Sequence, residues 1–169
     1  LDDFAYNIEN WIYNYCTIYE DYELQKAIQE PLVRSLEYHK NFEKLVRFYY
    51  NFGISYNERS MTNEAIELLS KAIEIAIKEK QYKLIPNAKL EIANSYIIKN
   101  ENENAKKFLD EAILELKFIE DSTKRQSFLG EYYTTLGEYH SQNSSIKESI
   151  KAYKEALLYL GDPTEDARY

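Results

Sequence analysis

The sequence predicts an all-α protein, a right-handed α-solenoid of stacked antiparallel helix pairs. One pattern of large and small residues recurs three times, at separations of 40 and 44 residues, which is typical of stacked helical arrays. Only four glycines and three prolines occur among the 169 residues, and no stretch alternates as a strand would. Each helix pair buries only part of its apolar surface, so the pairs are predicted to form one continuous array.

The repeated pattern consists of columns in which the residue size is kept from copy to copy. Small residues in some columns allow two helices to approach closely, at the short end of the range of about 8–10 Å between helix axes. Large residues in the other columns fill the space beside them. In chain order the columns are Phe52/Ile92/Leu136, Gly53/Ala93/Gly137, Tyr56/Tyr96/His140, Ala65/Ala105/Ser149, Leu69/Leu109/Tyr153 and Ala72/Ala112/Ala156.

Residues 1–41 precede the repeats and are predicted to form N-terminal helices. An apolar stripe at helical spacing predicts a helix over residues 3–20, and a short helix is expected around residues 22–29. Pro31 should end that short helix or begin the next one at its first turn. The segment is interpreted either as separate helices or as a degenerate first repeat.

The three repeats are predicted to form one domain over residues 42–162, followed by a polar tail over residues 163–169. The repeats themselves are expected over residues 42–80, 86–120 and 123–160. Their helices are predicted over residues 42–58 and 63–79, 86–99 and 103–120, and 124–142 and 146–160.

Local signals support several of these boundaries. Pro86 suits the first turn of a helix, and Asn100 can adopt the left-handed conformation in the turn that follows. Thr123 and Gln126 have the spacing of a capping box. Gly161 and Pro163 are expected to end the final helix.

Composition excludes several classes of function. The net charge is −8, and no Lys/Arg cluster is dense enough for binding nucleic acid through its phosphates. No apolar run reaches the length of a membrane span. Cys16 is the only cysteine, which excludes an internal disulfide and favours a reducing, cytoplasmic location. Because the chain begins at Leu1 and not at Met, further sequence is expected upstream.

No residue pattern indicates catalysis, a metal site or a cofactor. His39 and His140 are far apart and lack the spacing of metal ligands. His140 occupies a column that holds Tyr in the other two copies, so packing is the preferred interpretation. A glycine-rich phosphate loop is excluded by the four glycines. The sequence therefore predicts a protein that is not an enzyme and binds no cofactor.

A ligand is expected in the concave groove of the solenoid, lined by the first helix of each pair. Asparagine amides there can donate to and accept from one peptide unit of an extended chain. The alternative interpretation is that each Asn is an ordinary solvated residue. The predicted contact residues are Arg47, Tyr50, Ile54 and Asn57 from the first repeat, Asn87, Leu90, Asn94 and Ile97 from the second, and Glu131, Thr134, Glu138 and Ser141 from the third.

The columns resemble the tetratricopeptide repeat over roughly residues 42–160. The second copy departs from that pattern at Lys89, where a bulky residue is usual. The resemblance implies helix pairs that bind peptides or proteins. It is carried in the first helix by Tyr49, Phe52, Gly53 and Tyr56, and in the second helix by Ala65, Leu69 and Ala72.

The repeat length of about 40 residues and the Lys/Ile/Asn/Tyr-rich composition are similar to those of the peptide-pheromone receptors of Gram-positive bacteria, the Rap, PlcR and NprR group. That resemblance implies quorum sensing and transcription regulation, with groove asparagines holding the backbone of a short imported peptide. Many members carry an N-terminal helix-turn-helix domain, which here would precede Leu1. The leading interpretation is therefore the peptide-sensing part of a bacterial regulator, and the alternative is a structural adaptor that joins larger proteins.

Two further expectations concern partners. Glu131 and Glu138 lie near one end of the predicted groove and Arg47 near the other, so a bound segment should place a cationic group near the third repeat. The final helix keeps an apolar face that is predicted to meet a second copy in a two-fold homodimer, or further repeats. That face includes Ile150, Tyr153, Leu157, Leu158 and Leu160.

Overall fold

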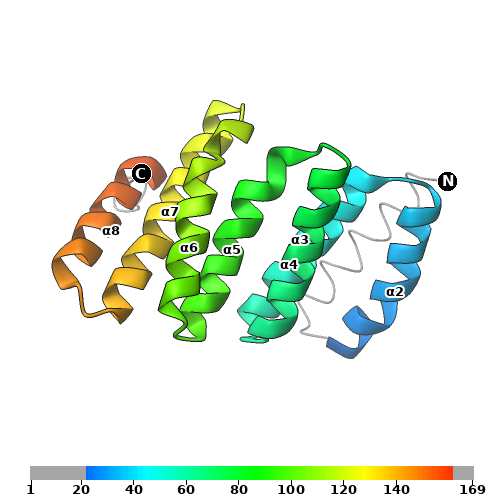
Figure 1. Cartoon of the computed structure of the whole chain (residues 1–169), viewed down its shortest axis with the longest axis horizontal. Helices are drawn as coiled ribbons and strands as arrows, with labels where there is room; N and C mark the ends of the chain where they lie inside the picture. Colours follow the sequence, from blue (N-terminus) through cyan, green and yellow to red (C-terminus); the bar gives the residue numbers. More distant parts are fainter. Residues whose placement is uncertain (1–21, 162–169) are drawn as a thin grey trace, which may run out of the picture. The chain divides into compact units, whose positions relative to one another are not determined.

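The structure is a computed structural model that describes residues 22–161. Within this range the chain forms seven α-helices and two short 3₁₀ helices, and it contains no strand (Figure 1). The predicted all-α class is therefore confirmed. The elements are α2 (Tyr22–Tyr38), α3 (Phe42–Glu58), α4 (Thr62–Lys78), η1 (Tyr82–Leu84), α5 (Ile85–Ile98), α6 (Asn102–Leu114), η2 (Leu116–Phe118), α7 (Ser122–Gln142) and α8 (Ile146–Leu160).

The chain divides into two compact units, residues 1–45 and residues 46–169. The described part of the first unit contains α2 and the beginning of α3, where the Asn41 side chain accepts a hydrogen bond from the Lys44 amide at 3.3 Å. The predicted helix over residues 3–20, Cys16 and the polar tail lie outside the described residues.

Pro31 lies inside α2, so the prediction of a short helix that breaks at this proline was wrong. Proline removes one backbone donor and leaves the carbonyl four residues earlier without its helical partner. Pro31 and Ala27 are both exposed, so solvent can satisfy that carbonyl and the helix continues to Tyr38.

The second unit consists of helices packed in adjacent antiparallel pairs (Figure 1). The helix α5 contacts α4, α6 and α7, and α7 contacts both α6 and α8. This arrangement is a helical solenoid, in which each pair covers part of the apolar face of its neighbour.

The small columns of the sequence pattern are the points of closest approach between helices. Ala65, Ala93 and Ala105 have no exposed surface, and a Cβ built at Gly53 would lie 2.5 Å from Leu69 Cγ on α4. Ser149 takes the place of alanine in the third copy and donates to the Gly137 carbonyl at 2.9 Å. The columns are thus buried contacts between the helices of each pair.

The connection between the second and third repeats differs from the prediction. The helix expected over residues 103–120 ends at Leu114 and is followed by η2. The shorter helix allows Phe118 to stack on Tyr82, with ring centroids 4.9 Å apart, and Ile119 to enter the core with 6% exposure. Tertiary packing therefore outweighs local helix propensity at this end.

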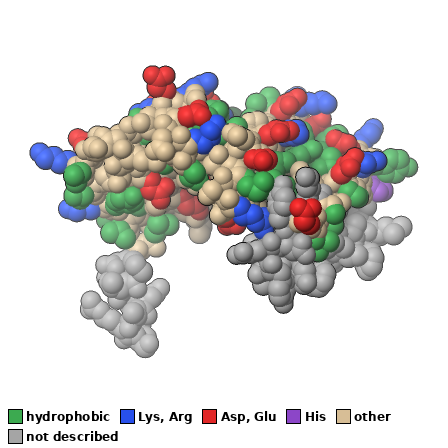
Figure 2. All heavy atoms as spheres, turned by 90° about the horizontal axis from the view of Figure 1, so that it is seen from below, with side chains coloured by type: hydrophobic (Ala, Val, Ile, Leu, Met, Phe, Trp, Pro, Cys, Tyr) green, Lys and Arg blue, Asp and Glu red, His purple; other side chains and the backbone are tan. Residues whose placement is uncertain are grey.

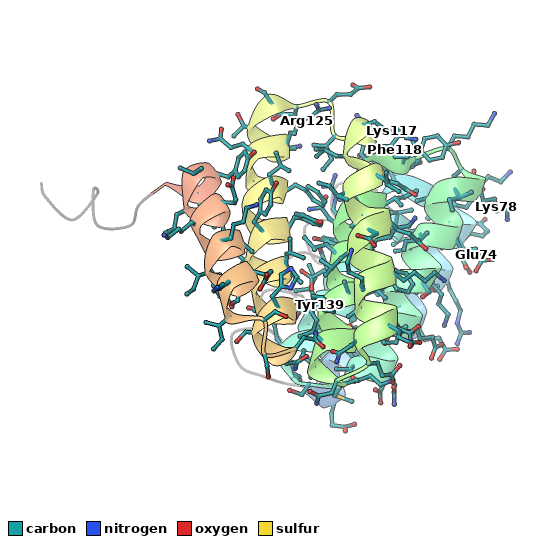
Figure 3. All side chains as sticks on the ribbon, turned by 60° about the vertical axis from the view of Figure 1, so that its left-hand side comes forward. Glu74, Lys78, Lys117, Phe118, Arg125 and Tyr139 are labelled. Atoms are coloured by element: carbon teal, nitrogen blue, oxygen red, sulfur yellow. The ribbon has the colours of Figure 1, made fainter. Side chains whose placement is uncertain are left out.

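The cap of α7 is Asp121, and the predicted capping box at Thr123 was wrong. The helix begins at Ser122, and the Asp121 carboxylate accepts a hydrogen bond from the Lys124 amide at 2.9 Å. Arg125 strengthens this end by donating from Nε to the Ile119 carbonyl at 3.1 Å. Figure 3 shows Arg125 at this end of α7, near Lys117 and Phe118.

Within residues 22–161, five turns between helices use a left-handed residue that is not glycine. In each turn the backbone amide of the residue after the left-handed one donates to the carbonyl five residues earlier, which is the Schellman arrangement. An example is the bond from the Gln81 amide to the Ala76 carbonyl at 2.7 Å. The prediction for Asn100 is confirmed, and Gly161 ends α8 with a φ of 80°. The five residues are Lys40, Ser60, Lys80, Asn100 and Ser144, with φ between 53° and 59°.

Replacing Lys80 with glycine is expected to raise the free energy of unfolding by about 0.5–1 kcal/mol, because the left-handed conformation penalises a Cβ. Asn100→Gly should give a smaller gain, since asparagine tolerates this conformation better. Thermal unfolding of both variants checks the expectation. An equal or larger gain for Asn100→Gly would contradict this explanation of the turns.

Candidate functional site

The first helix of each pair in the second unit, α3, α5 or α7, is here called an A helix. Of the predicted contact residues, Arg47, Glu131, Glu138 and Ser141 are exposed, and Tyr50, Ile54, Asn87, Asn94 and Thr134 are half-buried. Asn57, Leu90 and Ile97 are buried. The predicted stripe therefore spans two different environments.

The buried members of the stripe lie where neighbouring helices pack together. Leu90 belongs to a core cluster that includes Phe128 and Tyr132 of α7, and Ile97 is 5% exposed. Gln142 of α7 donates to the Ile97 carbonyl at 2.8 Å. Because these side chains are occupied with packing, Leu90 and Ile97 are left out of the surface described below.

Asn57 uses its amide to join α3 to α5. Its Nδ2 donates to the Glu91 carbonyl at 3.0 Å and to the Glu91 carboxylate at 3.3 Å. Its Oδ1 accepts from the Ser95 hydroxyl at 2.6 Å, and Ser95 is fully buried. The amide is therefore satisfied within the protein and positions the Glu91 side chain.

Glu91 was missed by the sequence analysis and is the central residue of this region. Burial raises the pKa of Glu91, an effect that the hydrogen bond from Asn57 opposes. The negative charge of Glu131 raises the pKa further, whereas a hydrogen bond from Asn94 opposes the rise. Glu58 adds a smaller repulsion. Carboxylates from α3, α5 and α7 thus act on one another.

Two more carboxylates on α7 are partly desolvated, although both side chains are exposed overall. Desolvation raises the pKa of Glu131, and the Ser127 hydroxyl, 3.4 Å from Glu131 Oε1, opposes the rise. Desolvation also raises the pKa of Glu138. Within residues 22–161 no Lys or Arg forms an ion pair with Glu91, Glu131 or Glu138.

These observations define a surface that we call the A-helix face. Its members share a helical phase. Six of the eight belong to the predicted stripe, whereas Glu58 and Glu91 each lie one residue after a predicted position. Negative charge predominates, with amides between the carboxylates. The A-helix face consists of Arg47, Ile54 and Glu58 on α3, Asn87, Glu91 and Asn94 on α5, and Glu131 and Glu138 on α7.

The chemistry of the A-helix face suits the binding of charged and hydrogen-bonding groups. Carboxylates accept hydrogen bonds from cationic groups, and amides both donate and accept. In the described part of the chain no group of three or more His, Cys, Asp or Glu side chains is arranged to hold a metal ion. None of the described helices has the length and apolarity to cross a membrane.

Glu91→Gln is expected to raise the free energy of unfolding at neutral pH. Because the pKa of Glu91 is raised in the folded state, folding is favoured when Glu91 is protonated. This contribution to stability is complete below the ordinary pKa of a Glu side chain and is lost as pH rises through the pKa of the folded state. The gain should therefore vanish in acid. Urea unfolding across pH checks this, with Glu74→Gln on the outer side of α4 (Figure 3) as the control. A gain that persists in acid would contradict the electrostatic explanation.

Comparison with protein families gives a match in the second helix pair. Residues 86–114, which span α5 and α6 from Pro86 onward, match the family described as tetratricopeptide repeat. No curated protein matches the chain. Tetratricopeptide repeats are in general non-catalytic modules of protein interaction. The match therefore confirms a repeat of this kind in the second helix pair and indicates a protein-binding scaffold, whereas the similarity to pheromone receptors is not shown.

Proposed function

We propose that the A-helix face binds a protein or peptide segment that carries a positively charged group. The observation that supports this most directly is the set of Glu91, Glu131 and Glu138, whose pKa values are all raised mainly by desolvation. Carboxylates held in such surroundings lower the stability of the free protein. A cationic ligand would offset that cost, so its binding would be favoured.

The polar groups around the carboxylates favour a peptide backbone as the rest of the ligand. Asn87 and Asn94 are half-buried on α5, and an amide side chain can satisfy both the donor and the acceptor of one peptide unit. Arg47 at the α3 end is exposed and suits an anionic group of the ligand. The proposed orientation therefore places the cationic group near α7 and the anionic group near α3.

The finer proposal is that the ligand is a short peptide and the protein the sensing part of a bacterial regulator. Its support is the repeat length and composition and the two half-buried asparagines of α5. The alternative is an adaptor for larger proteins, which the exposed apolar residues of α8 favour. If the protein is a sensor, an isolated short peptide should bind with the full affinity of the natural ligand. If it is an adaptor, binding should require a folded partner protein.

Binding of a labelled pool of randomised short peptides, divided into basic, neutral and acidic sets, tests the proposed function. Wild-type protein is expected to retain basic peptides, and Glu138→Lys should weaken their binding about tenfold while neutral peptides change little. Glu148→Lys on α8 makes the same change in net charge outside the A-helix face and serves as the control. Fluorescence anisotropy at two salt concentrations measures both.

Equal loss for neutral and basic peptides in Glu138→Lys would contradict a role for this carboxylate in recognising charge. An equal effect of Glu148→Lys would show that net charge alone controls binding. If none of the peptide sets binds, the peptide-sensing proposal fails.

A further inference from the structure

The last helix, α8, presents an exposed apolar face. On α4 and α6, residues at the same repeat positions are covered by a neighbouring helix. Leu69 on α4 and Leu109 on α6 have no exposed surface, whereas their counterpart Tyr153 on α8 is 37% exposed. Leu69 packs against Ala88 and Ile92 of α5. In α4 and α6 this column is therefore covered by the first helix of the next pair.

The exposed residues of α8 extend this column into a stripe along the helix. Leu157 corresponds to Ile113, and Leu160 corresponds to Leu116, and both counterparts pack on the cluster that contains Phe128 and Tyr132 of α7. On α8, Leu157 and Leu160 are 50% and 56% exposed. The stripe consists of Ile146, Ile150, Tyr153, Leu157 and Leu160.

A row of lysines borders the stripe on one side. Lys147, Lys151 and Lys154 follow at helical spacing and are exposed, and none of them forms an ion pair within residues 22–161. The corresponding residues on the two covered helices are Asn63, Glu67 and Ser70 on α4 and Glu103, Lys107 and Asp110 on α6. A uniformly basic border is thus present on α8 and absent from α4 and α6. Figure 2 shows green apolar atoms next to blue basic atoms at the end of the molecule where α8 lies in Figure 1.

We propose that α8 binds an amphipathic α-helix of another protein, with two large apolar residues four positions apart and acidic residues along the adjoining edge. The pair of large apolar residues follows from the covered face of α6, where Phe128 and Tyr132 of α7 occupy this place. On α4 the same place is taken by the smaller Ala88 together with Ile92. The acidic edge follows from charge complementarity with the three lysines. This surface is separate from the A-helix face and adds a second binding function.

A second copy of the chain is a poorer fit to α8 than an acidic helix. In a two-fold pair of antiparallel α8 helices the symmetry axis places the lysine rows of both copies along the same edge. Each copy would then place its three lysines, Lys147, Lys151 and Lys154, opposite those of the other copy. The like charges on the two facing helices would repel each other.

Synthetic amphipathic helices of about 18 residues, long enough to fold in isolation, provide the probes. Two probes share one apolar stripe and differ only in a flank of Glu or of Lys. The 169-residue chain is expected to bind the Glu-flanked probe at least about tenfold more tightly in fluorescence anisotropy. The triple variant Lys147→Glu, Lys151→Glu, Lys154→Glu should reverse that preference. Ile150→Ser with Leu157→Ser should weaken both probes.

The matched control is the triple variant Lys78→Glu, Lys83→Glu, Lys117→Glu, which makes the same change in net charge away from α8; Figure 3 shows Lys78 and Lys117. It should keep the preference for the Glu-flanked probe. Circular dichroism verifies that each variant folds. Equal affinity for the two probes, or binding of neither, would overturn the proposal. A concentration-dependent dimer in light scattering that Leu157→Ser abolishes would assign the stripe to a second copy instead.

Discussion

Replacing Gly53 with leucine is expected to lower the free energy of unfolding by about 1–3 kcal/mol or more. A Cβ at this position would lie 2.5 Å from Leu69 Cγ and 2.7 Å from Leu69 Cδ2. Leu69 has no exposed surface and packs against Ala88 and Ile92. It therefore cannot move aside without disturbing α5 as well.

Urea unfolding of Gly53→Leu measures this cost, and Ser70→Leu provides the control, because Ser70 is an exposed small residue on α4. The control should stay within about 0.5 kcal/mol of wild type. A double-mutant cycle of Gly53→Ala and Leu69→Ala tests the contact itself. Since the two side chains would collide, Gly53→Ala should cost less when Leu69 is already alanine. Wild-type stability of Gly53→Leu would refute the close packing of α3 on α4.

The helix pairs could be predicted from the sequence because each column reflects side chains of complementary size, a small residue on one helix facing a large residue on its partner. A glycine at position 53 and a leucine at position 69 are complementary across one helix pair, and the same relation recurs at Gly137 and Tyr153. Ends of helices were predicted less well. Asp121 and Thr123 are both good caps, and only the contacts of the following residues select between them.

The A-helix face could be predicted only in part, because helical phase is ambiguous where a helix is buried on several sides. The helix α5 contacts α4, α6 and α7, so its apolar residues surround most of the axis and its periodicity does not indicate which side is free. Asn87 and Asn94 lie on the A-helix face, whereas Leu90 and Ile97 are in the interior. Glu91, the single acidic residue of α5, lies between Asn87 and Asn94 in the sequence and was the available signal for this side of the helix.

Lys89 departs from the repeat pattern, and the structure supplies a physical reason. Its ammonium group lies 2.5 Å from the Glu115 carboxylate and 3.1 Å from that of Glu111, while only 13% of the Lys89 side chain is exposed. The usual bulky residue of this column is thus replaced by a partly buried ion cluster between α5 and the end of α6. Such a cluster requires all its members, because each charge left without a partner would remain desolvated.

Lys89→Ala is therefore expected to lower the free energy of unfolding by about 2 kcal/mol, less than for a fully buried pair because both carboxylates retain some solvent. Lys71→Ala is the control: Lys71 pairs with Glu67 at 2.7 Å on the exposed surface of α4, and its loss should cost about 0.5 kcal/mol or less. Urea unfolding of both variants at neutral pH makes the comparison.

The pH dependence separates the ion cluster from simple loss of packing. Desolvation lowers the pKa of Lys89, but the hydrogen bonds and charges of Glu115 and Glu111 outweigh it and raise the pKa above its ordinary value of 10.5. The stability from a group with a raised pKa is complete below the ordinary value and is lost as pH rises through the folded value. The difference between wild type and Lys89→Ala should therefore shrink above pH 10.5. Lys89→Met, which keeps most of the side-chain volume, should still lose stability at neutral pH; if it matches wild type, packing and not charge holds this part of the solenoid together.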